Sequence, residues 1–374
     1  MTYSRFFLPL ISVWLCTTSL SAQGSGPVFP GLTGQPLLDS LFSHYRPEVV
    51  LSYADARDTL YAKVLAIDDD SLRCIYSGHA LYLDPTQDPT QYVYLDGMSN
   101  GMNAEHSYPQ SKGATQGTNA HSDMHHLYAT RIPVNEARGD SPFGEIPDAQ
   151  TQKWFIRNQV STTIPAQNKD LYAEYRTTVF EPRESVKGNL ARSVFYFYTM
   201  YRNQANTADP NFFEIQRPIL CQWNQQDPAD SAELVKTWRI AAYQNGKPNP
   251  FVLDCSLAYR TWCPEVPPTS CATSRTEEAN SQAALGLRIT PNPVTDMARL
   301  EMTLPFAGAL RGRVLSVLGQ ELAVFETAEV PSGGFSLPLD VSALGRPGGW
   351  LGFVEVEVIA GGRRAVQVVP MVVW

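Results

Sequence analysis

The sequence NAEHSYPQS at residues 103–111 is followed by SDMHHLY at residues 122–128 and by VNEARGDSPFGE at residues 134–145. This stretch holds four of the chain's six histidines, together with carboxylates, amides and an arginine. Hard oxygen ligands, a neutral base and a cation are the groups that metal-assisted attack on a phosphodiester requires. Packing alone does not explain such a density of polar groups, so the stretch predicts an active site with that chemistry.

Four residues of this stretch are candidates for the reacting groups. Glu105 can offer a divalent cation an anionic oxygen and Asn135 a neutral carbonyl oxygen, and both suit Mg²⁺. His106 can accept a proton from water near neutral pH. Asn135 and Arg138 are spaced to share one face of an expected short helix, which would set a cation for gripping phosphate beside the metal ligand.

The positions of Glu105 and His106 raise a geometric difficulty, because the two residues are adjacent in the chain. Neighbours on a regular strand point to opposite faces. Both side chains can serve one site only if the backbone leaves ideal strand geometry there, as it does at the end of a strand.

The other histidines of the stretch have plainer interpretations. His121 lies in a loop-like segment and is expected to be solvated. A zinc site made of His121, His125 and His126 is an alternative, although adjacent histidines on a regular element rarely bind one ion. The preferred interpretation is that His126, together with Asp123, supports the site through hydrogen bonds.

The three blocks quoted above resemble signature blocks of the bacterial endonuclease I family. The similarity extends over roughly residues 50 to 255. The chain departs from the family pattern at Ala104, where many members have Arg, and at Lys112, where many have an aromatic residue. Further matches are YSG at 76–78, FEP at 180–182, VKG at 186–188, AR at 191–192 and NPFVLD at 249–254.

This resemblance implies a His-Me finger (ββα-metal) nuclease that cuts DNA, and often RNA, with little sequence preference. It implies that His106 is the general base and that Arg138 contacts phosphate. Glu105 and Asn135 would hold Mg²⁺ or another divalent cation such as Ca²⁺ or Mn²⁺. Two other functions stay open: a phosphodiesterase acting on small nucleotides, and a non-catalytic surface adhesin that retains the scaffold.

The N-terminal residues indicate an exported protein. Arg5 precedes a mostly apolar run at 6–15, and SLSAQ at 19–23 offers small residues for cleavage, so residues 1–22 are predicted to be a signal peptide. The run is too short to cross ~30 Å of hydrocarbon, and no later segment resembles a membrane span. We therefore expect a secreted or cell-surface protein.

The formal net charge of −8 argues against a protein that coats nucleic acid with a generally basic surface. It leaves room for an enzyme that grips a few phosphates of DNA or RNA locally. Such an enzyme is expected to be a monomer.

Removal of the signal peptide leaves five cysteines, an odd number that allows at most two disulfides. Export permits such bonds. Cys255 and Cys263 are the first candidates for a pair, and Cys271 is the candidate for the unpaired thiol. The remaining two are Cys74 and Cys221.

The chain is expected to contain an α+β catalytic domain at 23–263, a linker at 264–286 and a small all-β sandwich at 287–374. Residues 140–167 read as a long surface segment. The expected helices are 53–67, 185–201 and 231–243. The expected strands are 72–76, 92–95, 300–304, 314–318, 353–358 and 365–373, the last two joined by a turn at Gly361 and Gly362.

The C-terminal strands carry a resemblance of their own. ITPNPV at 289–294, VLSVLGQE at 314–321 and LDVSAL at 339–344 resemble elements of the type IX secretion sorting domain. Such domains direct cargo across the outer membrane and are commonly removed afterwards. The resemblance implies that the type IX secretion machinery is a partner of this chain.

Overall fold

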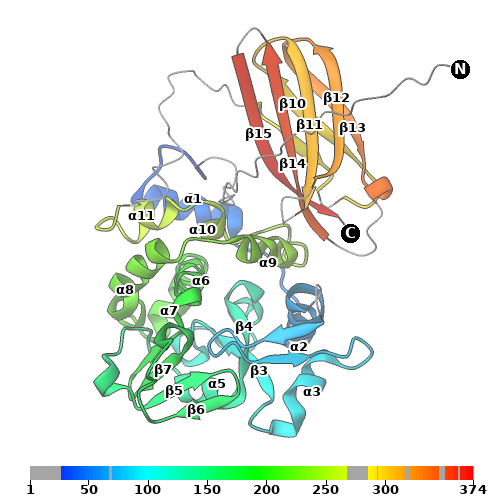
Figure 1. The fold of residues 1–374 in the computed structure, drawn as a ribbon. Helices are drawn as coiled ribbons and strands as arrows, with labels where there is room; N and C mark the ends of the chain where they lie inside the picture. The colour runs from blue at the N-terminus through cyan, green and yellow to red at the C-terminus, as the bar shows by residue number, and fades with distance from the viewer. Residues whose placement is uncertain are drawn as a thin grey trace, which may run out of the picture.

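The computed structural model describes residues 27–66, 70–267, 285–292, 294–316, 321–344, 350–360 and 363–373. The predicted signal peptide and most of the predicted linker lie outside these ranges. Helices and small antiparallel sheets are mixed along the chain, which confirms the α+β class (Figure 1). None of the helices in the described ranges has the length and apolar character that a bilayer crossing requires.

The helices of the N-terminal region surround α6, which is buried on nearly all sides. A helix that is apolar all round needs neighbours on every side, and α1, α7, α8 and α10 supply them. The helices are α1 (Gly34–Tyr45), α2 (Tyr53–Thr59), α3 (Pro89–Tyr94), α4 (Asn119–Ser122), α5 (Ile132–Arg138), α6 (Lys187–Met200), α7 (Arg202–Ala208), α8 (Phe212–Gln226), α9 (Ser231–Ala241), α10 (Pro250–Leu253) and α11 (Leu257–Thr261).

Three predicted helices are confirmed within the described residues. The one expected from residue 53 is α2, continued by the π-helix η1 (Leu60–Leu65). The one expected at 185–201 is α6, preceded by the short 3₁₀ turn η7 (Glu184–Val186). The third is α9.

The strands of this region form three small sheets. They are β1 (Ser71–Arg73) with β2 (Ala80–Tyr82), β3 (Met102–His106) with β4 (Leu127–Arg131), and the order β6-β5-β7-β8. The last sheet comprises β5 (Lys153–Ile156), β6 (Gln159–Ser161), β7 (Ala173–Arg176) and β8 (Val179–Glu181).

Two predictions about this region are wrong. The expected strand at 92–95 falls mostly within helix α3, because Asp88 caps the helix by accepting a hydrogen bond from the backbone N–H of Gln91, and Pro89 suits a first helical turn. The segment 140–167 is not all surface. It contains β5, whose Trp154 and Phe155 are buried, because the apolar run WFI reaches the core despite its polar flanks.

The predicted Cys255–Cys263 disulfide is also wrong. Cys263 is bonded to Cys221 of α8, with a Cα–Cα distance of 5.6 Å. Helix α11 lies between Cys255 and Cys263, whereas Cys221 reaches Cys263 because α8 packs against α11. Cys255 is itself disulfide-bonded, Cys74 is a buried free thiol, and Cys271 lies outside the described residues.

The C-terminal strands form two antiparallel sheets around a second apolar cluster, as the alternating pattern predicted. In β10 every second residue is buried. Ala360 pairs with Arg363, so the predicted turn joins two paired strands, although residues 361 and 362 are outside the described ranges. The sheets, ordered β13-β10-β9 and β12-β11-β14-β15, comprise β9 (Arg288–Thr290), β10 (Met297–Leu304), β11 (Gly308–Ser316), β12 (Glu321–Val330), β13 (Gly333–Asp340), β14 (Trp350–Ala360) and β15 (Arg363–Val373).

Candidate active site

A strand–strand–helix unit brings the predicted site residues close together. Strand β3 pairs antiparallel with β4, with Glu105 opposite Tyr128, and α5 follows β4 directly. The backbone N–H of Ile132, where α5 starts, donates to the carbonyl of Gly101 just before β3, at 3.0 Å. Residues near positions 105 and 135 therefore meet although the two segments are well separated in sequence. The predicted short helix that carries Asn135 and Arg138 is confirmed as α5.

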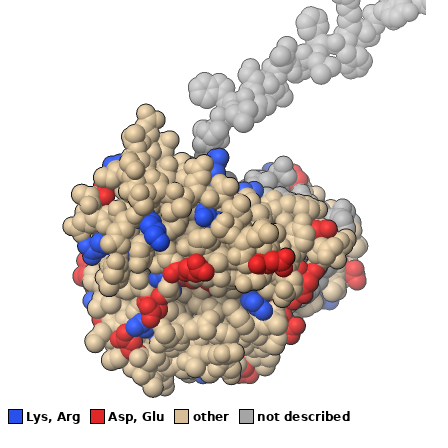
Figure 2. Space-filling model, turned by 90° about the horizontal axis from the view of Figure 1, so that it is seen from below, with Lys and Arg blue, Asp and Glu red and all other residues tan. Residues whose placement is uncertain are grey.

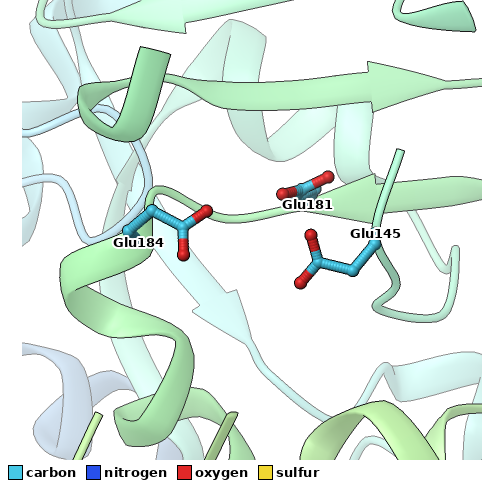
Figure 3. Close-up of side chains that lie close together, drawn as sticks. All are labelled: Glu145, Glu181 and Glu184. Atoms are coloured by element: carbon cyan, nitrogen blue, oxygen red, sulfur yellow. The ribbon is translucent and has the colours of Figure 1, made fainter. Parts of the chain in front are cut away.

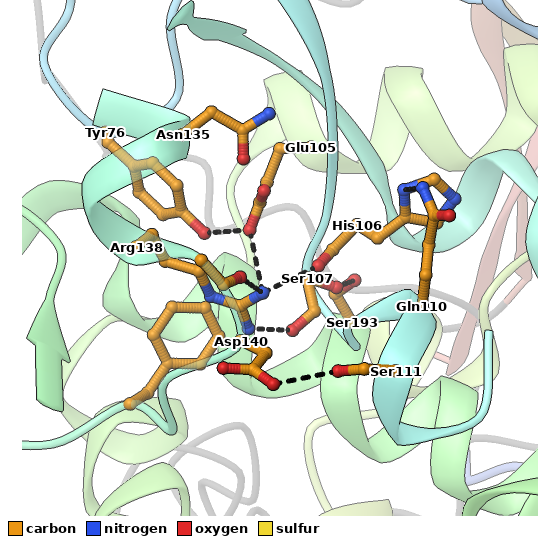
Figure 4. A network of polar contacts seen from close by, with 12 residues as sticks. Tyr76, Glu105, His106, Ser107, Gln110, Ser111, Asn135, Arg138, Asp140 and Ser193 are labelled. Carbon is orange, nitrogen blue, oxygen red and sulfur yellow. Dashed lines mark hydrogen bonds and ion pairs between the residues drawn. The ribbon is translucent and has the colours of Figure 1, made fainter. Parts of the chain in front are cut away.

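Glu105 is a buried carboxylate held by two donors (Figure 4). Its Oε1 accepts a hydrogen bond from the Tyr76 hydroxyl at 2.7 Å and lies 3.2 Å from Nη1 of Arg138. Burial raises the pKa of Glu105, while Arg138 and Tyr76 oppose that rise. A second cation close to this carboxylate would lower its pKa further.

Arg138 is also buried, and its guanidinium braces the backbone around β3. Nη1 donates to the carbonyl of His106 at 3.1 Å, and Nη2 donates to the carbonyl of Ser107 at 2.7 Å. The guanidinium lies over the ring of Phe143, 4.9 Å from its centroid. Its Nε is buried without a hydrogen-bond partner among the described residues. The predicted phosphate contact of Arg138 stays a prediction, since these contacts describe a positioning role.

His106 has its imidazole fixed in one tautomer. Its Nε2 lies 2.9 Å from the carbonyl oxygen of His121, and because a carbonyl only accepts, Nε2 must carry the hydrogen. Nδ1 therefore keeps a lone pair, which the side-chain amide of the exposed Gln110 approaches at 3.4 Å. Burial lowers the pKa of His106 to about 3, so the ring is neutral at neutral pH. A neutral imidazole with one oriented lone pair is suited to accept a proton.

Asn135 is half-buried, and residues of strand β3 orient its side-chain amide. Its Nδ2 donates to Oδ1 of Asn103 at 2.7 Å and to the carbonyl of Ala104 at 3.3 Å. No donor among the described residues reaches its Oδ1. Figure 4 shows this oxygen turned toward the Glu105 carboxylate. Asn135 and Glu105 thus present a neutral and an anionic oxygen in the same place.

The imidazole of His106 lies on another side of β3 from this pair of oxygens. Figure 4 shows the ring directed toward Gln110 and away from Glu105 and Asn135. Both Glu105 and His106 keep their strand pairing, opposite Tyr128 and Leu127, so the backbone does not leave the ladder here. The structure therefore brings Glu105, Asn135 and Arg138 together and sets His106 to one side, as regular strand geometry requires.

Asp123 is fully buried behind the site and is the centre of a hydrogen-bond network. It accepts from the hydroxyls of Tyr196 at 2.8 Å and Tyr201 at 2.7 Å. It also accepts from Nε2 of Gln244 at 2.8 Å and from the backbone N–H of His125 at 3.0 Å. Asp123 therefore fixes the 3₁₀ turn η4 (Met124–His126) to the helices rather than contacting the reacting groups.

His126 supports the site by packing. Its ring centroid lies 5.3 Å from that of His106, and its Nε2 lies 2.7 Å from the carbonyl of Ala120. His121 was expected to be solvated, which is wrong: it is buried in α4 and its ring packs on Tyr53, with a centroid distance of 4.0 Å. The nitrogens of His121, His125 and His126 form no metal-binding group among the described residues.

Sequence reasoning did not assign a role to Tyr76, Gln110 or Asn103. Each contacts a predicted site residue: Tyr76 contacts Glu105, Gln110 contacts His106, and Asn103 contacts Asn135. Tyr76 stood in a matched motif, but its distance along the chain gave no sign of this contact. Asn103 and Gln110 belong to the first quoted block, and that proximity was the one available signal.

A second polar cluster, with one buried and two exposed carboxylates, resembles a metal site more closely than the predicted one does. Glu145, Glu181 and Glu184 bring carboxylate oxygens within 4.8 Å of one another (Figure 3). The ammonium of Lys187 already binds all three, at 2.9, 2.8 and 2.6 Å, and Nε1 of Trp223 donates to Glu145 at 2.5 Å. Burial raises the pKa of Glu181 to about 8, against the opposing effect of Lys187. A cation of the protein's own occupies this cluster.

The face of the molecule seen from below carries charges of both signs. Figure 2 shows Lys and Arg scattered singly among the described residues, with Asp and Glu gathered in a band. This face offers no continuous basic area, in keeping with the net charge of −8. Binding of a polyanion here would depend on a few local contacts rather than on a general field.

Comparisons with known proteins place this geometry in context. A family model described as Endonuclease I matches residues 36–255. An extracellular ribonuclease of Bacillus subtilis (strain 168) is 27% identical over 311 aligned residues, which cover 70% of this chain and 100% of that protein. An extracellular ribonuclease of Bacillus amyloliquefaciens is 28% identical over 316 residues, with the same two coverages.

Proposed function

The chain belongs to the endonuclease I family, and on that premise we propose that it is an exported, metal-dependent nuclease that hydrolyses DNA and RNA with little sequence preference. Membership of the family supports endonuclease activity. The names of the two relatives, both extracellular ribonucleases, support export and activity on RNA. The proposed reaction is attack on phosphorus by a water molecule that His106 deprotonates.

The observation that carries this proposal is the fixed tautomer of His106. Its Nε2–H is held by the carbonyl of His121, so Nδ1 is the nitrogen that accepts the proton. The lowered pKa of His106, which burial causes, keeps the ring unprotonated at neutral pH. The negative charge of a bound phosphate would raise that pKa toward the range in which a general base works best. Substrate and water would reach Nδ1 by displacing the side chain of Gln110, whose contact there is long.

Glu105 and Asn135 fit a hard divalent cation. The donor set is one carboxylate and one amide oxygen, and Asn135 Oδ1 has no donor among the described residues. Mg²⁺ is the proposed ion, with Mn²⁺ or Ca²⁺ as possible replacements. When bound, the ion would supply positive charge to the phosphoryl and leaving oxygens.

In an in-line displacement the attacking and leaving oxygens lie on opposite sides of the phosphorus atom. His106 is the last residue of β3, so a phosphate beyond the end of the strand could meet the base on one side and the cation site on the other. Arg138 would hold His106 and the cation site in fixed relative positions. It donates a hydrogen bond to the carbonyl of His106 and forms an ion pair with Glu105.

The replacement His106→Ala tests the mechanism. Loss of a general base typically costs about 10²- to 10⁴-fold in rate, so plasmid nicking should nearly cease while the melting curve stays close to that of the native protein. The matched control is His44→Ala, which removes an exposed histidine of α1. A chelator should silence the native protein, and Mg²⁺ should restore it.

Three results would contradict the proposal or part of it. Full activity of His106→Ala, or of the native protein in chelator, would exclude the mechanism. Metal-dependent binding of DNA without turnover would favour an adhesin. Hydrolysis of bis(4-nitrophenyl) phosphate at a kcat/KM equal to that on DNA would favour a small-substrate phosphodiesterase. Matched DNA and RNA strands in the same assay measure the substrate preference.

We also propose a division of the chain. Residues 1–22 are a signal peptide, and residues 23–263 form a monomeric catalytic domain with a His-Me finger site. Residues 264–286 are a linker to a type IX sorting module at 287–374. The separate apolar cluster of the C-terminal strands supports an independent unit there. Deletion of 287–374 should retain the nuclease in the periplasm of a host with that secretion system. Unchanged activity in the medium would exclude the sorting role.

A further inference from the structure

A second cavity, separate from the His106 site, lies between α1 and the start of α7. Its volume is about 450 Å³, within the range of small-ligand sites. Two guanidinium groups line it, those of Arg46 and Arg202, and so do the side chains of Gln35, Asn203 and Gln204. Phe42, with 43% of its surface exposed, forms part of the wall. Cationic, amide and aromatic groups therefore share one hollow.

The two arginines that line this cavity carry positive charges that no ion pair among the described residues neutralises. Neither makes an ion pair with a carboxylate among the described residues. Arg46 lies over the rings of Phe42 and Tyr201, 5.0 and 5.6 Å from their centroids, and its Nε is buried without a hydrogen-bond partner. Arg202 lies over the ring of Trp262 at 5.1 Å and donates one hydrogen bond, to Oε1 of Gln35.

The cavity also contains one carboxylate, that of Asp39. Its Oδ1 accepts a hydrogen bond from Nε2 of Gln35 at 2.7 Å. With two arginines and one aspartate, the lining keeps a net positive charge, in a protein whose total charge is −8. Positive charge concentrated in one hollow of an acidic protein favours an anionic ligand there.

The cavity is connected to the His106 site by a short run of packed backbone. The 3₁₀ turn η3 (Gln110–Lys112) begins with Gln110, which approaches His106 Nδ1. It ends at Gly113, which packs so tightly on α7 that an added Cβ would lie 2.7 Å from Cα of Ala205. The first turn of α7 then supplies the cavity residues. This packing fixes the two places relative to each other, so a strand of sufficient length would reach both and a shorter one would not.

We propose that this cavity is a second binding site for the polynucleotide, which holds one nucleotide unit of a single strand several positions from the scissile bond. Arg46 and Arg202 bind its phosphate, the ring of Phe42 stacks on its base, and the amides of Gln35 and Asn203 contact the base edges. Stacking on an aromatic ring combined with arginine contacts is how proteins hold single strands with little sequence preference. This inference rests on the proposed nuclease function, whose substrate site it extends.

The test is a length series of single-stranded oligonucleotides, from 4 to 30 nucleotides, cleaved by the full chain. The double variant Arg46→Gln with Arg202→Gln should raise KM for the longest strands about tenfold. Strands too short to reach the cavity should keep their native KM. The length at which the two curves separate measures the distance between the sites. The salt dependence of long-strand binding should also weaken, by about 0.7 in the logarithmic slope per lost phosphate contact.

Two further variants separate binding from stability. Asn203→Glu adds a carboxylate at an exposed position of the cavity, and the native side chain makes no hydrogen bond to any described residue that would be lost. This variant should also raise the KM for long strands. Arg299→Gln, on the exposed face of β10, removes the same charge elsewhere and should change nothing. Melting curves of all variants identify any that fail to fold.

The outcomes distinguish this inference from the function on which it rests. If the native protein cleaves no strand of any length, the nuclease proposal has failed. If it cleaves all lengths and the cavity variants change long and short strands equally, or neither, the second site is excluded. If a free mononucleotide occupies the cavity without any length-dependent effect on cleavage, the ligand is a free nucleotide and the strand-binding proposal is overturned.

Discussion

The His106 site and the Lys187 cluster are both groups of polar side chains around a buried charged residue, and they differ in which hydrogen-bonding atoms they leave without a partner. In the Lys187 cluster, one ammonium binds three carboxylates and an indole N–H donates to the same group. In the His106 site, Nδ1 of His106 has only a long contact, and Asn135 Oδ1 has no donor among the described residues.

The difference lies in what each group of side chains could still bind. Three glutamates in contact could together bind a metal ion, yet the ammonium of Lys187 already binds all three. The predicted site has one carboxylate, with atoms left over that could act on a substrate. Remaining donor and acceptor capacity, rather than charge count, separates a working site from a structural one.

The largest expected effect contrasts the two carboxylates Glu105 and Glu181. Glu105→Gln should lower kcat/KM on DNA by about 10²-fold or more, because Lewis-acid stabilisation is worth several kcal/mol. Glu181→Gln should keep the activity of the folded protein. Steady-state kinetics at increasing Mg²⁺ measure both. A Glu105→Gln enzyme within threefold of the native rate at saturating Mg²⁺ would remove the distinction between the clusters.

Lys187→Met should have the opposite profile. Removing the ammonium leaves the buried carboxylate of Glu181 without its cation, at a cost of about 3–5 kcal/mol in the free energy of unfolding. Urea denaturation measures that loss, and the folded fraction should cleave DNA normally. The matched control, Lys169→Met, breaks an exposed pair with Asp148 and should cost about 1 kcal/mol or less. Equal losses in the two variants would mean that the Lys187 cluster is not a structural centre.

The Lys187 cluster should also make stability depend on pH. Burial raises the pKa of Glu181 to about 8 from its ordinary value of 4.5, so between these values the folded state binds more protons than the unfolded state. The free energy of unfolding should therefore fall as pH rises from about 5 to 8, by up to about 1.4 kcal/mol per pH unit. Glu181→Gln should flatten this slope. Urea denaturation midpoints at several pH values measure this dependence. If Glu181→Gln leaves the slope of the unfolding free energy against pH unchanged, Glu181 is not its cause.

The smallest expected effect concerns the hydrogen bond that orients Glu105. Tyr76→Phe removes one neutral donor and should cost about 1 kcal/mol of stability. It should also reduce kcat severalfold, because Glu105 then keeps only Arg138 among its side-chain partners. Tyr82→Phe, at a largely exposed position of β2, is the control. A Tyr76→Phe variant that loses stability but no activity would make this hydrogen bond purely structural.

Local sequence signals predicted the parts of the site that are local in the chain. The spacing of Asn135 and Arg138 predicted a short helix, and that helix is α5. The expected departure from strand geometry at Glu105 and His106 is wrong, because both residues keep their pairing in β3 and their side chains diverge as strand neighbours do. Both are consequences of helical and strand periodicity, which short segments impose whatever surrounds them.

Contacts between distant segments could not be predicted in this way. The bond from Tyr76 to Glu105 depends on how the turn of the β1–β2 hairpin packs against β4, where the backbone N–H of Ile75 donates to the carbonyl of Ala129. The Cys221–Cys263 bond depends on the course of α8 past the end of α11. The helix at 89–94 was mistaken for a strand because its tyrosines and valine favour strands, whereas the cap at Asp88 decided the outcome.

The Cys221–Cys263 bond has a consequence for the life of the protein after export. Cleavage just after residue 267 would create a new chain end only a few residues past Cys263, and an end of that kind ordinarily frays. The crosslink closes a loop with a sequence separation of 42 residues, worth about 4 kcal/mol in a chain-entropy treatment. The disulfide would therefore keep the last helix, α11, folded in a trimmed protein. A folded chain end of this kind would resist extracellular proteases.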